Sequence, residues 1–484
     1  MQASARYQLF LVALAIWCGA AAVGLFHHEW YFLALPALVW LIGWHRAIAG
    51  TLITALVVGG VLMAIRHQAI SHNVVAPFLD HTVLVSMDFS VRSDPVLGQP
   101  KDEGGYIKPA ATTALTSAIA LTVKGVRVQT HVPIRVTTSE HVTWLPGTVI
   151  RCSGLLYSSS EQKVVGLLAV RGLCSVLHEA DWIERTAGLI RAALRGVCIR
   201  LHSSAGNLIP GLVLGDISLE SHPFVVTMLS SGLTHLTAVS GENFAIIAAS
   251  LSWLLQWMIP RARVRVIISA CVLAGFIIVV RPSPSVLRAG VMVAAMLFAQ
   301  VRGVRASPLP SLGLAISFLI FLNPFEATDP GFALSVAATG GIILFQHRIT
   351  LGLERFFPVH RFAKIYEILA IPIAANVLCL PIAIAISGQL SLVSLITNVL
   401  VEPAIVPVTV IGCIAAVVTP VLPALGFVLV WTVAPFSWWI CQVAAVGARV
   451  PVIQFAHGWL GAGAGVATLY LIWLVVRIRA WRSL

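Results

Sequence analysis

The chain has 484 residues, of which 58% are hydrophobic and only 10% charged, whereas soluble globular domains carry about 45–50% apolar and about 25% charged residues. This composition excludes a soluble fold, because a water-facing surface for such a chain needs far more charge. The 8 cysteines contain no Cys-x-x-Cys pair, which argues against a zinc ribbon or a thioredoxin-type redox site. The net charge of +12 becomes informative only through its position along the chain.

Residues 1–65 are predicted to form N-terminal transmembrane helices, since runs of about 20 apolar residues span a bilayer. The runs are Leu9–Phe26, Trp30–Gly43 and Ala47–Ile65, the middle one being short. No small-residue cleavage site follows the first run, so we expect no cleaved signal peptide. Three crossings from a cytoplasmic N-terminus place residue 66 outside.

Residues 66–178 are more polar, and no apolar run among them is long enough to span a bilayer. Five stretches alternate with the two-residue period of half-buried strands. They are His81–Val91, Ala114–Val128, His131–Thr138, Gly147–Ser158 and Val164–Gly172. We therefore expect a small extracytoplasmic β-barrel inserted between two membrane blocks. Cys152 and Cys174 lie in this domain, where an oxidising environment permits a disulfide; two separate buried thiols are the alternative.

Residues 179–207 are predicted to contain an amphipathic interfacial helix. Trp182–Leu201 is apolar on one side and carries four arginines, the pattern of a helix lying along a lipid surface. Contact with a polyanion is the alternative. The four cations are Arg185, Arg191, Arg195 and Arg200.

A second apolar block, residues 208–476, brings the predicted total to about 12 transmembrane helices. Its expected spans are Leu233–Met258, Val266–Val280, Pro284–Gln300, Pro308–Leu322, Gly331–Gln346, Ile368–Ser387, Ser391–Thr419, Pro420–Ala448 and Trp459–Val476. The uncharged junction at Thr419 and Pro420 leaves a re-entrant arrangement open. The chain is thus expected to be a polytopic α-helical membrane protein.

The loops that this topology places in the cytoplasm are basic, as the positive-inside rule requires. They contain Arg261, Arg263, Arg265, Arg302, Arg305, Arg348, Arg355, Arg361 and Lys364. A basic tail follows at residues 477–484. We therefore expect both termini in the cytoplasm, and much of the excess positive charge sets orientation instead of indicating nucleic-acid binding.

Polar groups inside a bilayer are costly and therefore point to a pathway. Ser231–Asn243 gathers several of them at the entrance of a predicted span, where a water-lined cavity or broken helix explains them better than lipid. Hydrogen bonding between packed helices is the alternative for each residue. Arg288 and Glu402 are two charged residues within predicted spans, and the structural explanation for them is an ion pair with each other. The candidate pathway residues are His235, Ser240, Glu242, Asn243, Arg281, Arg288, Asn398 and Glu402.

Enzymatic motifs are absent from the sequence. It contains no Gly-x-x-x-x-Gly-Lys-Ser/Thr loop, no His-Glu-x-x-His and no two-metal hydrolase cluster,. Ser240 and His235 are five residues apart on one predicted helix, which is a poor geometry for a nucleophile and its base. We expect no enzymatic activity, no metal and no cofactor.

Four motifs resemble those of the ComEC family, bacterial competence proteins thought to form the inner-membrane channel for incoming single-stranded DNA. They are Leu214–Asp216, Gly232–Gly241, Pro284–Ala289 and Asp329–Ala338, in the order and spacing of the family. In the family an outward-facing OB-type domain precedes the channel, in agreement with the five predicted strands. Leu145–Gly154 resembles its central strand.

Two features depart from the family pattern. Glu242-Asn243 follows Ser240-Gly241, where members commonly carry Leu-His or Ala-Asn, and a carboxylate facing a DNA path repels phosphate unless it is paired or protonated. The sequence stops at Leu484 without the metallo-β-lactamase-like domain of many members. The resemblance therefore implies a channel whose strand degradation is performed by another protein.

The resemblance implies a channel component that translocates single-stranded DNA across the cell membrane during natural transformation. The expected partners are single-stranded DNA, the lipid bilayer, and a separate DNA receptor, helicase and nuclease, with a homo-oligomer left open. A DNA path needs cations and stacking platforms, and a solvated strand face is the alternative for each cation. The expected contacts of the OB-like domain are Lys124, Arg127, Arg135, Arg151, Trp144 and Tyr157.

A secondary transporter of a small solute is the alternative function. Protons would drive it through Glu242, Glu402 or His235. Inverted repeats favour such a transporter, and no convincing internal symmetry is visible in the sequence.

Overall fold

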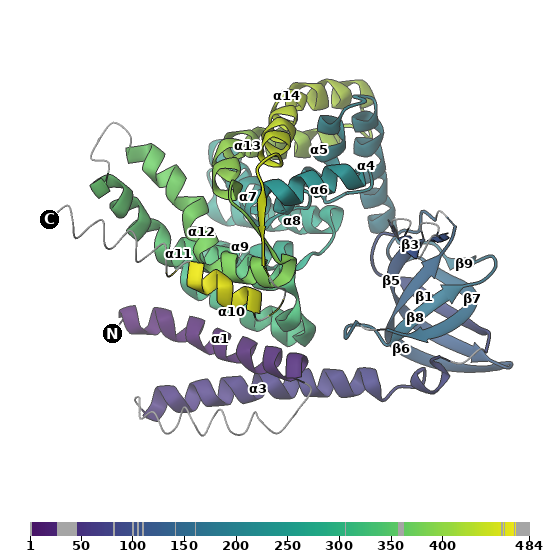
Figure 1. Ribbon diagram of the computed structural model, residues 1–484. Helices are drawn as coiled ribbons and strands as arrows, with labels where there is room; N and C mark the ends of the chain where they lie inside the picture. Colours follow the sequence, from purple (N-terminus) through teal and green to yellow (C-terminus); the bar gives the residue numbers. More distant parts are fainter. Residues whose placement is uncertain are drawn as a thin grey trace.

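The computed structural model describes residues 2–26, 46–80, 83–98, 101–103, 106–108, 111–140, 142–159, 161–304, 306–356, 363–455, 458, 460–468 and 470. A bundle of helices carries a β domain at one end (Figure 1). The predicted span Trp30–Gly43 and the tail at 477–484 lie outside the described residues. So do much of Trp459–Val476 and the loop residues Arg305 and Arg361.

The described residues include eight helices that are long and apolar enough to cross a membrane. They are α1 (Gln2–Phe26), α3 (Arg46–Ser71), α8 (Ala262–Val280), α9 (Pro284–Val301), α11 (Pro330–Phe356), α12 (Ala363–Ser387), α13 (Ser394–Val418) and α14 (Pro423–Gly447). A shorter apolar helix, α10 (Pro308–Leu322), lies among them. The chain is therefore a membrane protein, and the total of about 12 crossings stays a prediction.

The motif at Ser231–Asn243 forms a break between helices. α6 (His222–Ser231) ends at Gly232, which has a left-handed φ of +77°. A short 3-10 helix, η3 (Thr234–Leu236), follows, and α7 (Gly241–Met258) begins only at Gly241. The expected span Leu233–Met258 is therefore wrong at its start, because the N-cap Ser240 begins a new helix by accepting the Asn243 backbone N–H at 3.2 Å,.

Two further helices connect the β domain to this break. α4 (Trp182–Ile199) packs against α5 (Ser204–Leu214) and α8, and α5 also contacts α13 and α14. Another 3-10 helix, η4 (Pro324–Thr328), joins α10 to α11. α4 thus lies against the bundle along part of its surface, although its placement at a membrane interface stays a prediction.

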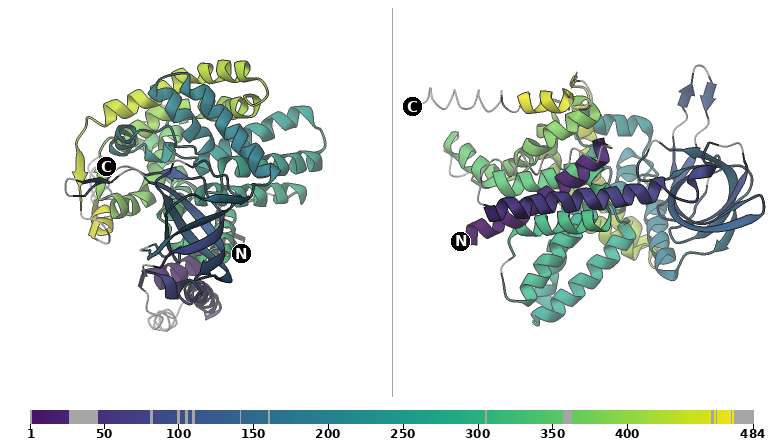
Figure 2. Two further views of the ribbon diagram at one scale, coloured as in Figure 1. Left: turned by 90° about the vertical axis from the view of Figure 1, so that its right-hand side faces the viewer. Right: turned by 90° about the horizontal axis from the view of Figure 1, so that it is seen from below.

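Two glycines bring α1 and α3 into close contact. A Cβ added to Gly59 would lie 2.0 Å from the Ile16 carbonyl oxygen, and one on Gly19 would lie 2.0 Å from that of Leu56. Small residues at such positions allow membrane helices to approach closely. The right-hand view of Figure 2 shows α3 continuing from the bundle toward the β domain.

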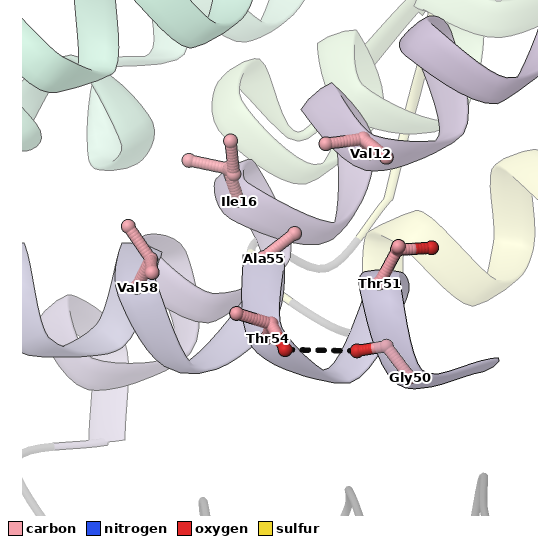
Figure 3. Close-up of a pocket in the computed structure, with 7 residues that line it drawn as sticks. All are labelled: Val12, Ile16, Gly50, Thr51, Thr54, Ala55 and Val58. Atoms are coloured by element: carbon pink, nitrogen blue, oxygen red, sulfur yellow. Dashed lines mark hydrogen bonds between the residues drawn. The ribbon is translucent and has the colours of Figure 1, made fainter. Parts of the chain in front are cut away.

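A pocket of about 630 Å³ lies between α1 and α3 (Figure 3). Its lining residues are Val12, Ile16, Gly50, Thr51, Thr54, Ala55 and Val58. The Thr54 hydroxyl donates a hydrogen bond to the Gly50 carbonyl at 2.9 Å. None of these described lining residues is charged.

Five strands of the β domain pair in a closed ring. They are β1 (Val85–Val91), β5 (Thr112–Val123), β6 (Val126–Thr138), β7 (Val149–Ser158) and β8 (Gly166–Val170). The ring runs β1–β5–β6–β8–β7 and returns to β1, with only the β6–β8 pair parallel. Within it, β7–β1–β5–β6 has the strand order of a Greek key. The strands curve around a common axis in the right-hand view of Figure 2.

The part of the chain that the structure describes contains six short strands outside this ring. β2 (Val96–Leu97) pairs with β5, and β9 (Ser175–His178) pairs with β7. β3 (Lys101–Glu103) and β4 (Tyr106–Lys108) form their own hairpin. In the helical part, β10 (Gln389–Ser391) pairs with β11 (Val452–Gln454).

The predicted strand Ala114–Val128 is wrong because a turn divides it. Lys124 and Gly125 both have positive φ, +50° and +86°, which is the backbone that a two-residue hairpin requires. β5 therefore ends before this pair and β6 begins after it. The other four predicted strands fall on β1, β6, β7 and β8 with shifted ends.

The barrel interior is filled by alternating apolar side chains. Phe89, Ile134 and Ile150 are fully buried within it. The Trp144 ring lies 5.9 Å from the Phe89 ring, centroid to centroid, at the edge of this core. Trp144 therefore packs against the edge of the barrel core while staying partly exposed, and its expected role in stacking with bases stays a prediction.

A disulfide joins Cys152 of β7 to Cys174 in the segment before β9. We expect alkylation of the denatured, unreduced protein to label the six other cysteines and, after reduction, all eight. Replacing both bonded residues by alanine should lower the free energy of unfolding by about 3 kcal/mol, as expected for a loop of this size. Mass spectrometry measures the labelling; eight labels without reductant would contradict the bond.

The close contact of α1 and α3 predicts different effects for two glycines of one helix. Gly59→Ala should destabilise the protein by about 1–3 kcal/mol, because the new Cβ forces the backbones apart. Gly50→Ala is the matched control, since a Cβ there meets nothing within 4 Å and alanine favours a helix. Thermal unfolding of the full chain in detergent measures both, and equal effects would contradict the close contact.

Candidate functional site

Charged side chains hold the β domain against one end of the helical bundle. Asp94, in the loop after β1, accepts from Arg281 at 3.0 Å and from Arg191 of α4 at 3.1 Å. Arg281 also binds Glu184, at the start of α4. Arg281 is thus a contact between domains, and its expected place in a DNA pathway stays a prediction.

Arg281 has an unusual backbone for a non-glycine residue. It follows α8 with φ of +74° and ψ of +140°, a region whose use costs about 1–3 kcal/mol. The carboxylates of Asp94 and Glu184 hold the guanidinium that extends from this position. The ion pairs between domains therefore accompany a strained turn between α8 and α9.

The prediction that the arginines of the amphipathic helix face lipid or a polyanion is wrong for Arg191. Its side chain turns into the protein, where only 8% of the residue is exposed. It donates to the backbone carbonyls of Leu214 at 2.5 Å and Val279 at 3.1 Å, besides pairing with Asp94. Arg191 is therefore unavailable to lipid or a polyanion, because burial required it to find internal acceptors.

A second contact joins the β7–β8 loop to the bundle. Lys163 forms an ion pair with Asp329, and Gln162 donates to the Gly24 carbonyl of α1 at 2.9 Å. Asp329 also accepts the Phe332 backbone N–H at 3.0 Å at the start of α11. The β domain thus rests on the ends of α1 and α11 as well as on the α8–α9 turn.

Three of the four sequence motifs meet inside the bundle. The Gly241 backbone N–H donates to the Ser285 hydroxyl at 2.9 Å, and the Ser335 hydroxyl donates to Ser285 at 3.0 Å. Arg288 donates through Nε to Ser335 at 3.0 Å and through Nη1 to Thr339. These five residues, which link α7, α9 and α11, are called the polar seam below.

The fourth motif lies at the end of α5. Gly215, with φ of +69°, ends that helix, and Asp216 accepts from Arg195 of α4 at 3.3 Å. Asp216 also accepts the Ser218 backbone N–H at 3.1 Å. This motif therefore shapes the turn between α5 and α6 and ties it to α4.

The expected ion pair between Arg288 and Glu402 is not formed. Among the described residues, no carboxylate lies within ion-pair distance of Arg288, of which only 5% is exposed. Glu402 of α13 lies within hydrogen-bonding reach of Glu242 instead. Two carboxyl groups in contact share a hydrogen bond only if one of them carries a proton.

The remaining pathway candidates have separate surroundings. Asn243 is buried and donates to the Leu212 carbonyl at 3.0 Å. Asn398 donates to the Ser394 carbonyl at 2.7 Å, one turn earlier on α13. His235 is exposed on η3. The structure thus brings Ser240, Glu242 and Asn243 together at the start of α7, with Arg288 and Glu402 beside it.

Sequence reasoning missed the hydroxyl groups of the polar seam. Ser285, Ser335 and Thr339 are short side chains that also occur as ordinary packing residues in membrane helices. A usable signal was present for two of them, because Ser285 and Ser335 lie inside the motif runs quoted above. Sequence reasoning also missed Asp94 and Glu184, because carboxylates are common in loops and at the starts of helices and these two do not stand out.

Three of the four cations predicted to bind DNA in the β domain are paired with acids. Asp88 of β1 accepts from Arg151 at 2.5 Å and from Arg127 at 2.8 Å. Arg135 binds Glu161 at 2.6 Å. Lys124 occupies the exposed tip of the β5–β6 hairpin. Any polyanion on this surface must compete with these carboxylates.

The fold and the polar seam define a membrane protein with polar motifs facing one another inside its helices and a β domain attached at one end. A family model described as Competence protein matches residues 212–482, more than half of the chain. The chain therefore belongs to the Competence protein family. The resemblance to the ComEC family is confirmed.

One curated relative is ComE operon protein 3 of Bacillus subtilis (strain 168). It is 24% identical to this chain over 202 residues, which cover 40% of this chain and 24% of that protein. The match thus spans about a quarter of the relative's length. No solved structure matches the chain.

The Asp88 pair predicts a pH-dependent stability. The hydrogen bond from Arg151, with the charges of Arg151 and Arg127, holds the pKa of Asp88 below its usual range. Asp88→Asn should lower the free energy of unfolding at pH 7 by roughly 1–2 kcal/mol, because both arginines are half-exposed and screened. A carboxylate with a lowered pKa stabilises the fold above its unfolded pKa of about 4 and loses that effect below it.

The difference between wild type and Asp88→Asn should therefore shrink as the pH falls from about 5 to about 2. Thermal unfolding of the full chain, followed by the β-sheet circular dichroism signal, measures it. Glu140→Gln removes an exposed carboxyl of the same domain and serves as the control. A difference that stays constant across this pH range would contradict the lowered pKa.

Proposed function

We propose that this protein is a channel component that moves single-stranded DNA across the cell membrane into the cytoplasm during natural transformation. The observation that carries the proposal is the meeting of three family motifs in the polar seam. Membership of the Competence protein family supports a role in DNA uptake. Polar groups within a membrane are costly, so they are usually found along a pathway or in a packing contact between helices. The polar groups of the seam connect three helices.

The β domain suits a first contact with DNA on the outside. We propose that it is an OB-like barrel, supported by its closed five-stranded ring and Greek-key order,. Its contacts with the α8–α9 and α10–α11 turns place it opposite the basic ends of those helices, where Arg302 lies. With the positive-inside rule, this favours a cell-membrane protein with about 12 crossings, an outward β domain and cytoplasmic termini.

The proposal assigns no catalytic step to this chain. Single-stranded DNA and the lipid bilayer are its expected partners, together with a separate receptor, a cytoplasmic helicase and a nuclease. Strand degradation then belongs to the nuclease. A homo-oligomer is compatible with the same role.

A secondary transporter of a small solute coupled to protons is the alternative. The observation that favours it is the contact between Glu242 and Glu402, because a carboxyl pair that shares one proton can exchange it during transport. In the channel proposal the two carboxyl groups limit repulsion of the DNA backbone when they share a proton.

Genetic complementation tests the channel. Deletion of the gene should abolish transformation, and a wild-type copy should restore it. A copy with Arg288→Gln should restore less than about a tenth of the transformants, because it removes the buried cation of the polar seam. Arg302→Gln, at the far end of the same helix, is the control and should restore transformation fully.

The readouts are the number of transformants and the amount of labelled DNA that becomes protected from external nuclease. Immunoblotting of membranes confirms equal amounts of each variant. Normal transformation in the deletion strain would overturn the proposal and leave the transporter as the better account.

A further inference from the structure

The charge on Arg288 has no partner of opposite sign within the described chain. The residue is 5% exposed, and its hydrogen-bond partners are the neutral side chains of Ser335, Thr339 and Met292. A buried charge is normally paired because burial removes its hydration. Arg288 is therefore a buried cation whose hydrogen-bond acceptors in the described chain are all neutral.

The surrounding backbone adds to this positive field. Arg288 lies in the second turn of α9, near the N-terminus at Pro284, and the N-terminus of α7 at Gly241 lies close to its guanidinium. Helix N-termini carry partial positive charge and favour anions, whereas cations are favoured at C-termini. Two helix ends and a guanidinium thus converge where a cation alone is disfavoured.

Gly241 makes this convergence possible. A Cβ at that position would lie 2.4 Å from Nη2 of Arg288 and 3.4 Å from the Ser285 hydroxyl. A side chain at this position would have to displace the guanidinium from its place beside the first turn of α7. The close approach is therefore built into the backbone of two sequence motifs.

The polar seam also contains the groups that recognise an oxyanion. Hydroxyl groups donate as well as accept, so Ser285, Ser335 and Thr339 can turn from accepting to donating when an anion enters. A guanidinium presents a planar fork of N–H groups that matches phosphate oxygens. Both kinds of group already lie within one bonded network.

We propose that the polar seam binds one phosphodiester group, held by the Arg288 guanidinium and the hydroxyls of Ser285, Ser335 and Thr339. The bound oxyanion supplies the negative charge that Arg288 lacks. The identity of the ligand as a phosphodiester of a DNA strand rests on the proposed function, whereas the oxyanion site itself rests on the geometry of the seam.

Weak binding is expected at such a site. A conducting pathway must bind its cargo well enough to admit it and weakly enough to release it. Glu242, the residue after Gly241, reaches Glu402 on α13, so the α7 N-terminus has a carboxyl pair beside the oxyanion site. This pair opposes a long residence of phosphate next to it.

The experiment uses the full chain in lipid nanodiscs and measures its thermal unfolding midpoint during titration with dimethyl phosphate or inorganic phosphate. Ionic strength is held constant with chloride. The midpoint of the wild type should rise with either ligand, because a ligand that binds the folded state stabilises it. Chloride alone should give no rise, and an equal rise with chloride would overturn selectivity for an oxyanion.

Variants locate the site. Arg288→Gln should weaken phosphate binding at least 10-fold, and Ser335→Ala should weaken it severalfold while keeping the cation. Thr339→Ser keeps the hydroxyl and should bind like the wild type, and Arg302→Gln is the control for a distant cation of the same helix. If Arg288→Gln does not fold, the contrast between Ser335→Ala and Thr339→Ser decides the matter. Unchanged binding in Arg288→Gln or in Ser335→Ala would overturn the site.

The outcome separates the site from the proposed function. Phosphate binding that depends on Arg288, combined with normal transformation in the deletion strain, keeps the oxyanion site and removes its assignment to DNA. Loss of transformation in Arg288→Gln with unchanged phosphate binding overturns the site and leaves the channel proposal in place.

Discussion

A bilayer offers no water to polar groups, so each polar side chain within the helices must find a partner inside the protein. This constraint explains the arrangement of α7, α9 and α11, where hydroxyl groups, a backbone N–H and a guanidinium bond to one another. It also explains why Asn243 bonds to a backbone carbonyl of α5. Arg288 has hydrogen-bond partners but no opposite charge among them, and for this reason we propose that it binds an anion.

Charge pairing also attaches the β domain. Asp94 joins Arg281 and Arg191, and Lys163 joins Asp329, so the barrel is held at two places on the bundle. One of these contacts involves Arg281, which has a strained backbone in the turn between α8 and α9, the helix that carries Arg288. The domain expected to meet DNA first is therefore connected, through one short turn, to the helix that contributes the buried cation.

Much of the fold was predictable because its signals are local. Hydropathy predicted α8 to α14 with most ends shifted by a few residues, although α11 continues ten residues beyond its predicted end at Gln346. Alternation predicted four of the five ring strands. The failures occurred where a single residue conformation decides the outcome. The Lys124–Gly125 turn divided one predicted strand, and the N-cap at Ser240 started α7 late.

The candidate site was predicted less well than the fold. The sequence indicated that Arg288, Glu242 and Glu402 are unusual, because each is costly in a bilayer. It did not indicate which of them meet, and the predicted pair of Arg288 with Glu402 was wrong. Pairing of residues far apart in the chain depends on helix packing, which has no local signal.

The sequence by itself determined the membrane class of the protein, its motifs and its family, because composition and motif order are properties of the chain alone. Only the tertiary structure decided that Arg288 has neutral partners, that Glu242 meets Glu402, and that Arg281 joins the two domains. The physical reason is that electrostatic and hydrogen-bond partners are chosen by distance in space. Those distances are set by how the helices and the barrel pack together.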